Sequence, residues 1–187
     1  MLKPPTQRAS GPPHPRRNIE IVQIDDEETA VTATATQRIS IRDVDPGAYK
    51  AVLGLEKYVH SGNLDHGLLE LVKMRSSQIN HCAWCLDMHA NAARKFGVEQ
   101  RKLDLVAAWR EAPALFTARE RAALALAEEV TLISEDGVSD AVWHDVTAVF
   151  DEKETVFLLM AIAAINVWNR MNVAARTELP AEPAVAG

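Results

Sequence analysis

The chain of 187 residues is 48% hydrophobic and 25% charged, with a formal net charge of -6 at pH 7. These proportions are typical of one soluble globular domain that is long enough to bury a core. The charge is unevenly spread, because residues 1–17 hold four basic side chains and no acidic one, which leaves -10 on the remainder. Nucleic-acid binding needs a basic surface, so we expect no nucleic-acid partner.

Cysteine content and hydropathy bear on the compartment. Two cysteines are too few for a secreted disulfide scaffold, and no N-terminal stretch has the apolar core of a signal peptide. We therefore expect reduced thiols and a cytoplasmic location. The longest apolar run, from Val156 to Trp168, contains Asn166 and is too short to cross about 30 Å of hydrocarbon. It predicts a buried helix and no membrane partner.

The chain begins with a proline-rich segment. Five of the nine prolines lie in residues 1–17, where the missing amide donors prevent a lasting helix. Residues 18–24 and 30–36 suit either a short strand or an arm laid on a partner. We predict a flexible N-terminal extension over residues 1–37, a helical domain over residues 38–178 and a flexible C-terminal tail over residues 179–187.

From Pro46 onward, apolar residues recur at spacings of three and four, with glycine or proline at the breaks. Asp65 is placed to cap one helix, and Thr117 with Glu120 forms a capping-box pattern that Asp151 and Glu154 repeat. The domain is therefore predicted to be all-α, a compact bundle of about seven helices joined by short loops. The expected helices cover approximately residues 46–60, 65–79, 82–96, 99–111, 117–133, 138–150 and 152–176.

Apolar stripes predict which helix faces are buried. In the first helix the stripe consists of Tyr49, Val52, Leu53 and Val59. The second helix has one predicted buried face, which consists of Leu68, Leu71, Val72 and Ile79. Polar residues interrupt the last, most apolar helix, and we expect them to bond to other helices or to line a pocket; they are Asn166, Asn169, Arg170 and Asn172.

The only two cysteines, Cys82 and Cys85, stand three residues apart, with His89 four residues further on and Glu70 twelve residues before Cys82. At about 100° per residue in a helix, Cys82 and His89 lie about 20° apart and Cys85 about 60° to one side. Positions three apart have Cα atoms about 5 Å apart, within the range that a disulfide tolerates. The pair can therefore close and open a disulfide without unfolding the chain.

Proton chemistry accompanies the two thiols. Only a thiolate attacks a peroxide or a disulfide, and the first turn of a helix favours the anion. His89 can accept the proton of Cys85 directly or through water, and Glu70 on the preceding helix can orient His89 or take the proton onward. The four residues supply a nucleophile, a resolving thiol and a proton route.

Two structural alternatives compete with dithiol chemistry. Free cysteines are often small core residues, and Cys82 and Cys85 suit that role. A zinc site is the second alternative, in which His81 or Asp87 would complete a set formed by the two cysteines and His89. Trp84, between the cysteines, either shields the dithiol, stacks on a substrate or simply packs in the core.

The segment from Glu70 through Cys82-Ala83-Trp84-Cys85 to His89 resembles the signature of the alkylhydroperoxidase D (AhpD)-like family, within the carboxymuconolactone decarboxylase-like superfamily. Similarity extends from about Arg38 to Arg176. The resemblance implies an all-helical fold that assembles as trimers or hexamers, with the two cysteines as redox pair and Glu70 and His89 as proton relay. Well-characterised members have histidine where this chain has Trp84, so one relay group is missing here.

These observations predict a thiol-dependent alkylhydroperoxide reductase of peroxiredoxin type, active in antioxidant defence. An external dithiol, on a lipoyl or thioredoxin-like protein, would reduce the Cys82–Cys85 disulfide again. We expect no cofactor and no metal, and the order in which the two thiols react stays open. The alternatives are a redox sensor or thiol-disulfide adaptor without peroxidase activity, and a lyase of the decarboxylase branch that would not need the cysteines.

Overall fold

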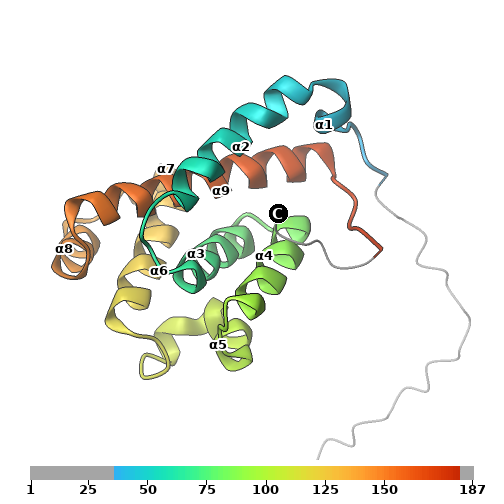
Figure 1. Ribbon diagram of the computed structural model, residues 1–187. Helices are drawn as coiled ribbons and strands as arrows, with labels where there is room; N and C mark the ends of the chain where they lie inside the picture. Colours follow the sequence, from blue (N-terminus) through green and yellow to red (C-terminus); the bar gives the residue numbers. More distant parts are fainter. Residues whose placement is uncertain (1–35, 182–187) are drawn as a thin grey trace, which may run out of the picture. The chain divides into compact units, whose positions relative to one another are not determined.

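Within residues 36–181, which the computed structural model describes, the chain forms nine α-helices and one 3-10 helix and no strand (Figure 1). The predicted strand or arm at residues 18–24 lies outside the described residues, as does almost all of residues 30–36. The helices are α1 Ile41–Val44, α2 Pro46–His60, α3 His66–Ile79, α4 Ala83–Lys95, α5 Gln100–Leu105, η1 Val106–Glu111, α6 Ala118–Thr131, α7 Ile133–Asp136, α8 Asp140–Val149 and α9 Glu152–Ala175.

The all-α prediction is confirmed, and each of the seven expected helices is present. The structure adds two helices of four residues each, α1 and α7, which are too short to show an apolar period. The expected helix over residues 99–111 is divided into α5 and the 3-10 helix η1, because Ala108 departs from helical geometry with φ -119° and ψ 29°. Within η1, Trp109 is buried, and its Nε1 donates to Glu128 of α6 at 2.8 Å.

Capping side chains set the beginnings of the long helices where the sequence predicts them. Asp65 accepts from the amide of Leu68 at 2.8 Å at the start of α3. Both predicted capping boxes form, with Thr117 and Glu120 at α6 and with Asp151 and Glu154 at α9. Each box satisfies two backbone amides that would otherwise lack a partner in the first turn.

Helix α3 is the centre of the bundle and packs against α4, α6 and α9. The prediction of a single buried face on this helix is wrong, because residues 67–74, Ser76 and Ser77 are all buried and Ile79 is only half-buried. Neighbours on several sides cover the polar positions of α3 as well as its apolar ones. The α2 stripe is partly correct: Val59 is buried, whereas Leu53 is 44% exposed.

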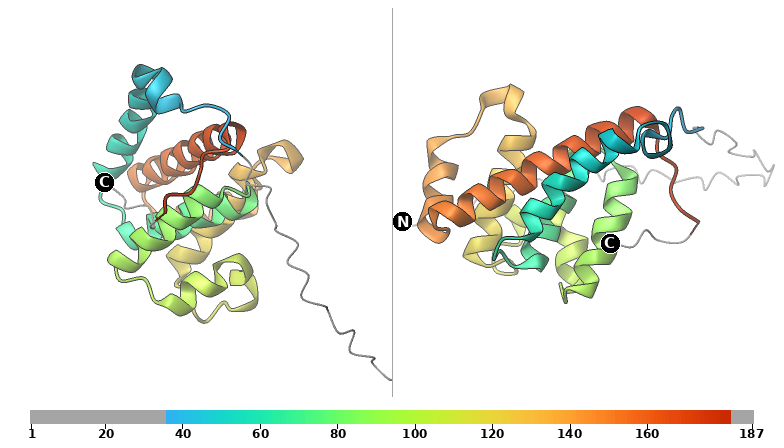
Figure 2. Two further views of the ribbon diagram at one scale, coloured as in Figure 1. Left: turned by 90° about the vertical axis from the view of Figure 1, so that its right-hand side faces the viewer. Right: turned by 45° about the horizontal axis from the view of Figure 1, so that its top comes forward.

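Helix α9 lies beside α2 and also contacts α3, α4, α6 and α8 (Figures 1 and 2). Its 24 residues match the helix predicted over residues 152–176, and among residues 36–181 it is the one helix that is long and apolar enough to span a bilayer. Its buried residues include Asn166 and Asn169, which bond to other helices of the bundle. Here α9 is a core helix.

The described chain ends meet beside the end of α9. The amide of Arg38 donates to the carbonyl of Ala175 at 2.8 Å, and Gln37 and Glu178 exchange two hydrogen bonds of 3.3 Å. The helices therefore occupy residues 41–175, inside the predicted domain of residues 38–178. The predicted flexible segments fall largely on residues 1–35 and 182–187, outside the described residues.

Candidate active site

The dithiol lies at the sharp turn between α3 and α4. His81 has a left-handed backbone with φ 55°, which is uncommon outside glycine. The amides of Asn80 and Cys82 on either side bond back to the carbonyls of Ser76 and Ser77, at 3.0 and 2.9 Å. This turn places Cys82 at the N-cap of α4 and leaves His81 exposed.

Cys82 and Cys85 are both buried, and the amide of Cys85 donates to Sγ of Cys82 at 3.4 Å. The hydrogen bond between the two sulfur groups lowers the pKa of Cys82 to about 7, against the opposing effect of burial and with help from the Cys85 amide and Asn169. The same shared hydrogen bond, together with burial, raises the pKa of Cys85. Cys82 is therefore the sulfur that forms a thiolate near neutral pH, and Cys85 is the one that keeps its proton.

Asparagines of α9 hold the dithiol from the other side. Nδ2 of Asn172 donates to Sγ of Cys85 at 3.4 Å, while its Oδ1 accepts from Thr177 at 3.0 Å. Nδ2 of Asn169 donates to the Ser77 hydroxyl at 2.9 Å. The expectation that these polar residues bond to other helices or line a pocket is confirmed for Asn166, Asn169 and Asn172, whereas the hydrogen bonds of Arg170 go to Asn166 on the same helix.

His89 and Glu70 form a buried pair next to the dithiol. Nδ1 of His89 lies 2.6 Å from Oε2 of Glu70, and the two side chains are 4% and 3% exposed. Nε2 of His89 is buried without a hydrogen-bond partner. Among residues 36–181 neither sulfur has a hydrogen bond to His89. The predicted contact between Glu70 and His89 is thus present, while proton transfer between His89 and a thiol stays a prediction.

A charged group that the sequence patterns did not predict lies beside this pair. Lys73 of α3 is fully buried, with Nζ 2.7 Å from Oε2 of Glu56, 3.3 Å from Nε2 of His60 and 3.9 Å from Oε1 of Glu70. Burial raises the pKa of Glu56, but the His60 ring and the Lys73 ammonium outweigh it and lower that pKa to about 2. The available signal was the spacing: Glu70 and Lys73 stand three apart on the most buried helix, and Glu56 and His60 four apart on α2.

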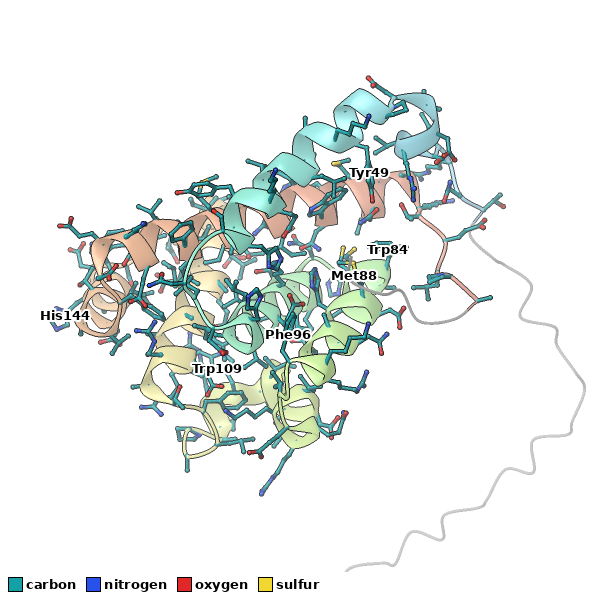
Figure 3. The ribbon with its side chains drawn as sticks, viewed as in Figure 1. Tyr49, Trp84, Met88, Phe96, Trp109 and His144 are labelled. Atoms are coloured by element: carbon teal, nitrogen blue, oxygen red, sulfur yellow. The ribbon has the colours of Figure 1, made fainter. Side chains whose placement is uncertain are left out.

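A pocket of about 160 Å³ lies between residues 37–42, the start of α2, the N-terminal end of α4 and the C-terminal end of α9, and Trp84 and Trp168 of its wall pack against the cysteines. Figure 3 labels two of its residues, Tyr49 on α2 and Trp84 on α4. Tyr49 meets Trp168 edge to face, with ring centroids 5.1 Å apart. Trp84 and Trp168 also pack against the two cysteines, so Trp84 lies between the sulfur atoms and the pocket. Other lining residues include Arg42, Met171 and Asn172.

The zinc alternative depends on a cluster of ligands around the cysteines. Among the described residues, no group of three or more histidine, cysteine, aspartate or glutamate side chains is placed to hold a metal ion. Nδ1 of His89 is already bonded to Glu70, and His81 is exposed. The geometry therefore gives no support to a zinc site at the dithiol.

Residues 46–129 match the carboxymuconolactone decarboxylase family. The chain is 37% identical over 139 residues to the uncharacterised protein YdfG of Bacillus subtilis (strain 168), a match that spans 74% of this chain and 94% of YdfG. The chain belongs to the AhpD-like carboxymuconolactone decarboxylase family. The family resemblance drawn from the cysteine motif is therefore confirmed.

Solved structures of the family extend the comparison. A protein of unknown function from Agrobacterium tumefaciens, described as a candidate antioxidant defence protein AhpD, is 41% identical with a TM-score of 0.76, and the match covers 79% of this chain and all of that one. The debrominase Bmp8 is 22% identical with a TM-score of 0.67 and 75% of each chain covered. At that identity the likeness to Bmp8 shows the fold alone.

The family match contains all four predicted site residues, and it also contains Glu56, His60 and Lys73. Asn172 and Trp168 lie beyond it, on α9. The carboxymuconolactone decarboxylase segment thus supplies the thiols and the charged group, while the end of α9 supplies the asparagine on Cys85 and part of the pocket wall.

Proposed function

We propose that this protein is a thiol-dependent hydroperoxide reductase of the AhpD type with an antioxidant role. The observation that carries the proposal is the unequal pair of buried thiols in one helical turn, in which Cys82 has a pKa of about 7 and Cys85 keeps its proton. The family and the neighbour described as an AhpD antioxidant defence protein support the same reading.

In the proposed order of attack, which the difference between the thiols supports, Cys82 reacts first. The Cys82 thiolate attacks the terminal oxygen of the hydroperoxide, the O–O bond breaks, and the alkoxide takes a proton to leave as an alcohol. Cys82 is now a sulfenic acid. The Cys85 sulfur attacks it, an S–S bond forms, and hydroxide leaves as water with the Cys85 proton. Two thiols are oxidised to a disulfide, and the peroxide is reduced to alcohol and water.

His89 and Glu70 supply the acid–base part of this cycle. In the proposed role, the unpartnered Nε2 of His89 exchanges protons with the dithiol through water, while Glu70 holds Nδ1 at 2.6 Å and fixes the ring. An external dithiol, on a lipoyl or thioredoxin-like protein, then reduces the disulfide by thiol exchange. We place the protein in the cytoplasm, where such reductants keep thiols reduced.

We further propose that the protein works as a homo-oligomer, a trimer or hexamer. Val156, Val167 and Val173 of α9 are 36–48% exposed, although α9 is the most apolar helix of the bundle. Light scattering on purified protein gives the number of subunits, and a monomer at assay concentration would rule this part out.

The test of the main proposal follows the consumption of cumene hydroperoxide with dihydrolipoamide or thioredoxin as reductant. We expect Cys82→Ser to abolish turnover and to leave no sulfenic acid after peroxide, whereas Cys85→Ser should accumulate the sulfenic acid at Cys82, detectable by mass spectrometry. Full turnover in both variants would refute the proposal. A reversible loss of two hydrogens without turnover would point to a redox sensor instead.

A further inference from the structure

The charged group of Glu56, His60 and Lys73 has no part in the reaction described above, although it adjoins the Glu70–His89 pair. We propose that these residues extend the proton relay from His89 through the core to solvent at His60. The inference rests on the proposed dithiol chemistry and deepens it, because it names the residues through which protons reach the buried thiols.

Polar side chains form a continuous series of contacts from His89 to His60. From the dithiol side the order is His89, Glu70, Lys73 and then His60, with the ionised Glu56 as counter-ion of Lys73. Successive polar atoms along it are 2.6 Å apart from His89 to Glu70, 3.9 Å from Glu70 to Lys73, and 2.7 Å and 3.3 Å from Lys73 to Glu56 and His60. The gap of 3.9 Å between Nζ of Lys73 and Oε1 of Glu70 is the widest step.

The second argument is the gradient of exposure. His89, Glu70 and Lys73 are 4%, 3% and 1% exposed, Glu56 is 17% exposed and His60 is 37% exposed. The sequence of contacts therefore begins in the core and ends at a side chain that water reaches. Among the buried charged side chains of residues 36–181, Lys73 contacts both Glu70, on the dithiol side, and Glu56, on the solvent side.

The third argument concerns His60 itself. As neutral imidazole, Nε2 of His60 accepts from the Lys73 ammonium at 3.3 Å; as imidazolium, the same atom faces Oε2 of Glu56 at 3.6 Å. The neutral ring has a hydrogen-bond donor in Lys73, and the protonated ring has a negative partner in Glu56. His60 can therefore take a proton from water and pass it to Lys73. Stacking of His60 on His66, and of His66 on Phe96, keeps the ring in place. The titratable groups around His60 are Glu56 on its own helix and His66 and Lys73 on α3.

Chemistry explains why such a route is useful. When an external dithiol reduces the Cys82–Cys85 disulfide, the S–S bond of the protein breaks, and the two thiols of the reductant release one proton each as they form a disulfide. Cys85 takes up a proton, and Cys82 is left as thiol or thiolate near pH 7, so the buried dithiol has to exchange protons with its surroundings. In the proposed reaction the reductant approaches the disulfide from the pocket, whose wall includes Trp84 and Asn172. At about 1.5 Å per residue, His60 lies about 16 Å from the pocket residue Tyr49 along α2. Protons can therefore arrive while the pocket is occupied.

The experiment measures re-reduction of the oxidised protein by dihydrolipoamide in dilute buffer at pH 7, with tryptophan fluorescence as signal, since Trp84 and Trp168 pack against the two cysteines. We expect His60→Ala to slow this step by about tenfold, less than the 10²–10⁴-fold that a group transferring the proton in the transition state contributes. Added imidazole should restore the rate. His144→Ala, which removes an exposed histidine of α8, is the matched control and should show neither the loss nor the rescue.

A second variant cuts the relay inside the core. Glu56→Gln combined with Lys73→Met removes one negative and one positive charge, so the core keeps its charge balance. We expect this variant to be slow and to stay slow in imidazole, because the added base replaces His60 but not Lys73. A role in stability alone predicts no dependence on imidazole in either variant.

Each result decides the inference. A wild-type rate in both variants, or equal rates with and without imidazole in His60→Ala, would overturn it. Because re-reduction needs no peroxide, a wild type that fails to consume hydroperoxide would refute the proposed function while this experiment still tests the relay.

Discussion

Replacing Glu56 by glutamine removes the negative charge beside the buried Lys73 and keeps the shape of the side chain. The pKa of Glu56 is lowered from 4.5 to about 2 by the His60 ring and the Lys73 ammonium, which outweigh burial. A difference of about 2.5, at about 1.4 kcal/mol for each pKa unit, corresponds to about 3 kcal/mol of stability. Because the pKa is lower in the folded state, this contribution is complete above pH 4.5 and is lost as the pH falls toward 2.

The free energy of unfolding of Glu56→Gln should therefore be about 3 kcal/mol below that of the wild type at pH 7, and the deficit should shrink to roughly half or less near pH 3. Glutamine resembles protonated glutamate, so the two curves converge in acid. Urea unfolding followed by circular dichroism at several pH values measures the difference. Glu111→Gln, at an exposed position in η1, is the control. A deficit that is the same at pH 3 and pH 7, or no deficit, would refute the reasoning.

Three further predictions concern the dithiol and the packing of the bundle. Alkylation of Cys82 by iodoacetamide, followed by mass spectrometry, should be half-maximal at about pH 7, and Cys85→Ala should move the midpoint upward, because the Cys85 thiol is the largest cause of the lowered pKa. Gly62→Ala should cost about 1–3 kcal/mol, because the new Cβ would lie 2.8 Å from the ring of Phe157. Gly54→Ala in α2 has open space around the new Cβ and should instead stabilise by about 0.5–1 kcal/mol, so a urea titration that ranks the two the other way contradicts the packing. Asp151→Ala removes the acceptor for the Glu154 amide at 2.7 Å and should cost about 1 kcal/mol, seen as a lower Tm.

Local signals in the sequence were enough for most of the fold. Capping residues such as Asp65, Thr117 and Asp151 act within one turn of their own helix, so their pattern predicts the helix starts without knowledge of the tertiary structure. The placement of Cys82 at the N-cap and of Cys85 in the first turn of α4 is equally local. Helix α1 was not predicted because four residues are too few to show an apolar period. The break at Ala108 was not predicted because no glycine or proline marks it in the sequence.

Long-range contacts set the parts of the site that sequence patterns did not predict. Lys73 lies in α3, but its partner Glu56 lies in α2, and only the packing of the two helices brings their side chains to 2.7 Å. In the same way, Asn172 reaches the sulfur of Cys85 across 87 positions of the chain. The spacing of Glu70, Cys85 and His89 showed that these residues can share a site. It did not show that the unpartnered Nε2 of His89 belongs to a buried pair next to a second group of charges.

The cost of the charged group argues for its function. A buried ion pair is often no more stabilising than apolar side chains of the same volume, because desolvation offsets the attraction. Replacing Lys73 alone would leave the carboxylates of Glu56 and Glu70 without their cation, but apolar side chains in place of the whole group would serve stability about as well. The lysine instead occupies the one position that contacts Glu70 on the dithiol side and Glu56 and His60 on the solvent side. A charged group that apolar packing could replace, placed between a buried acid–base pair and the surface, is best explained by the transfer of charge between them.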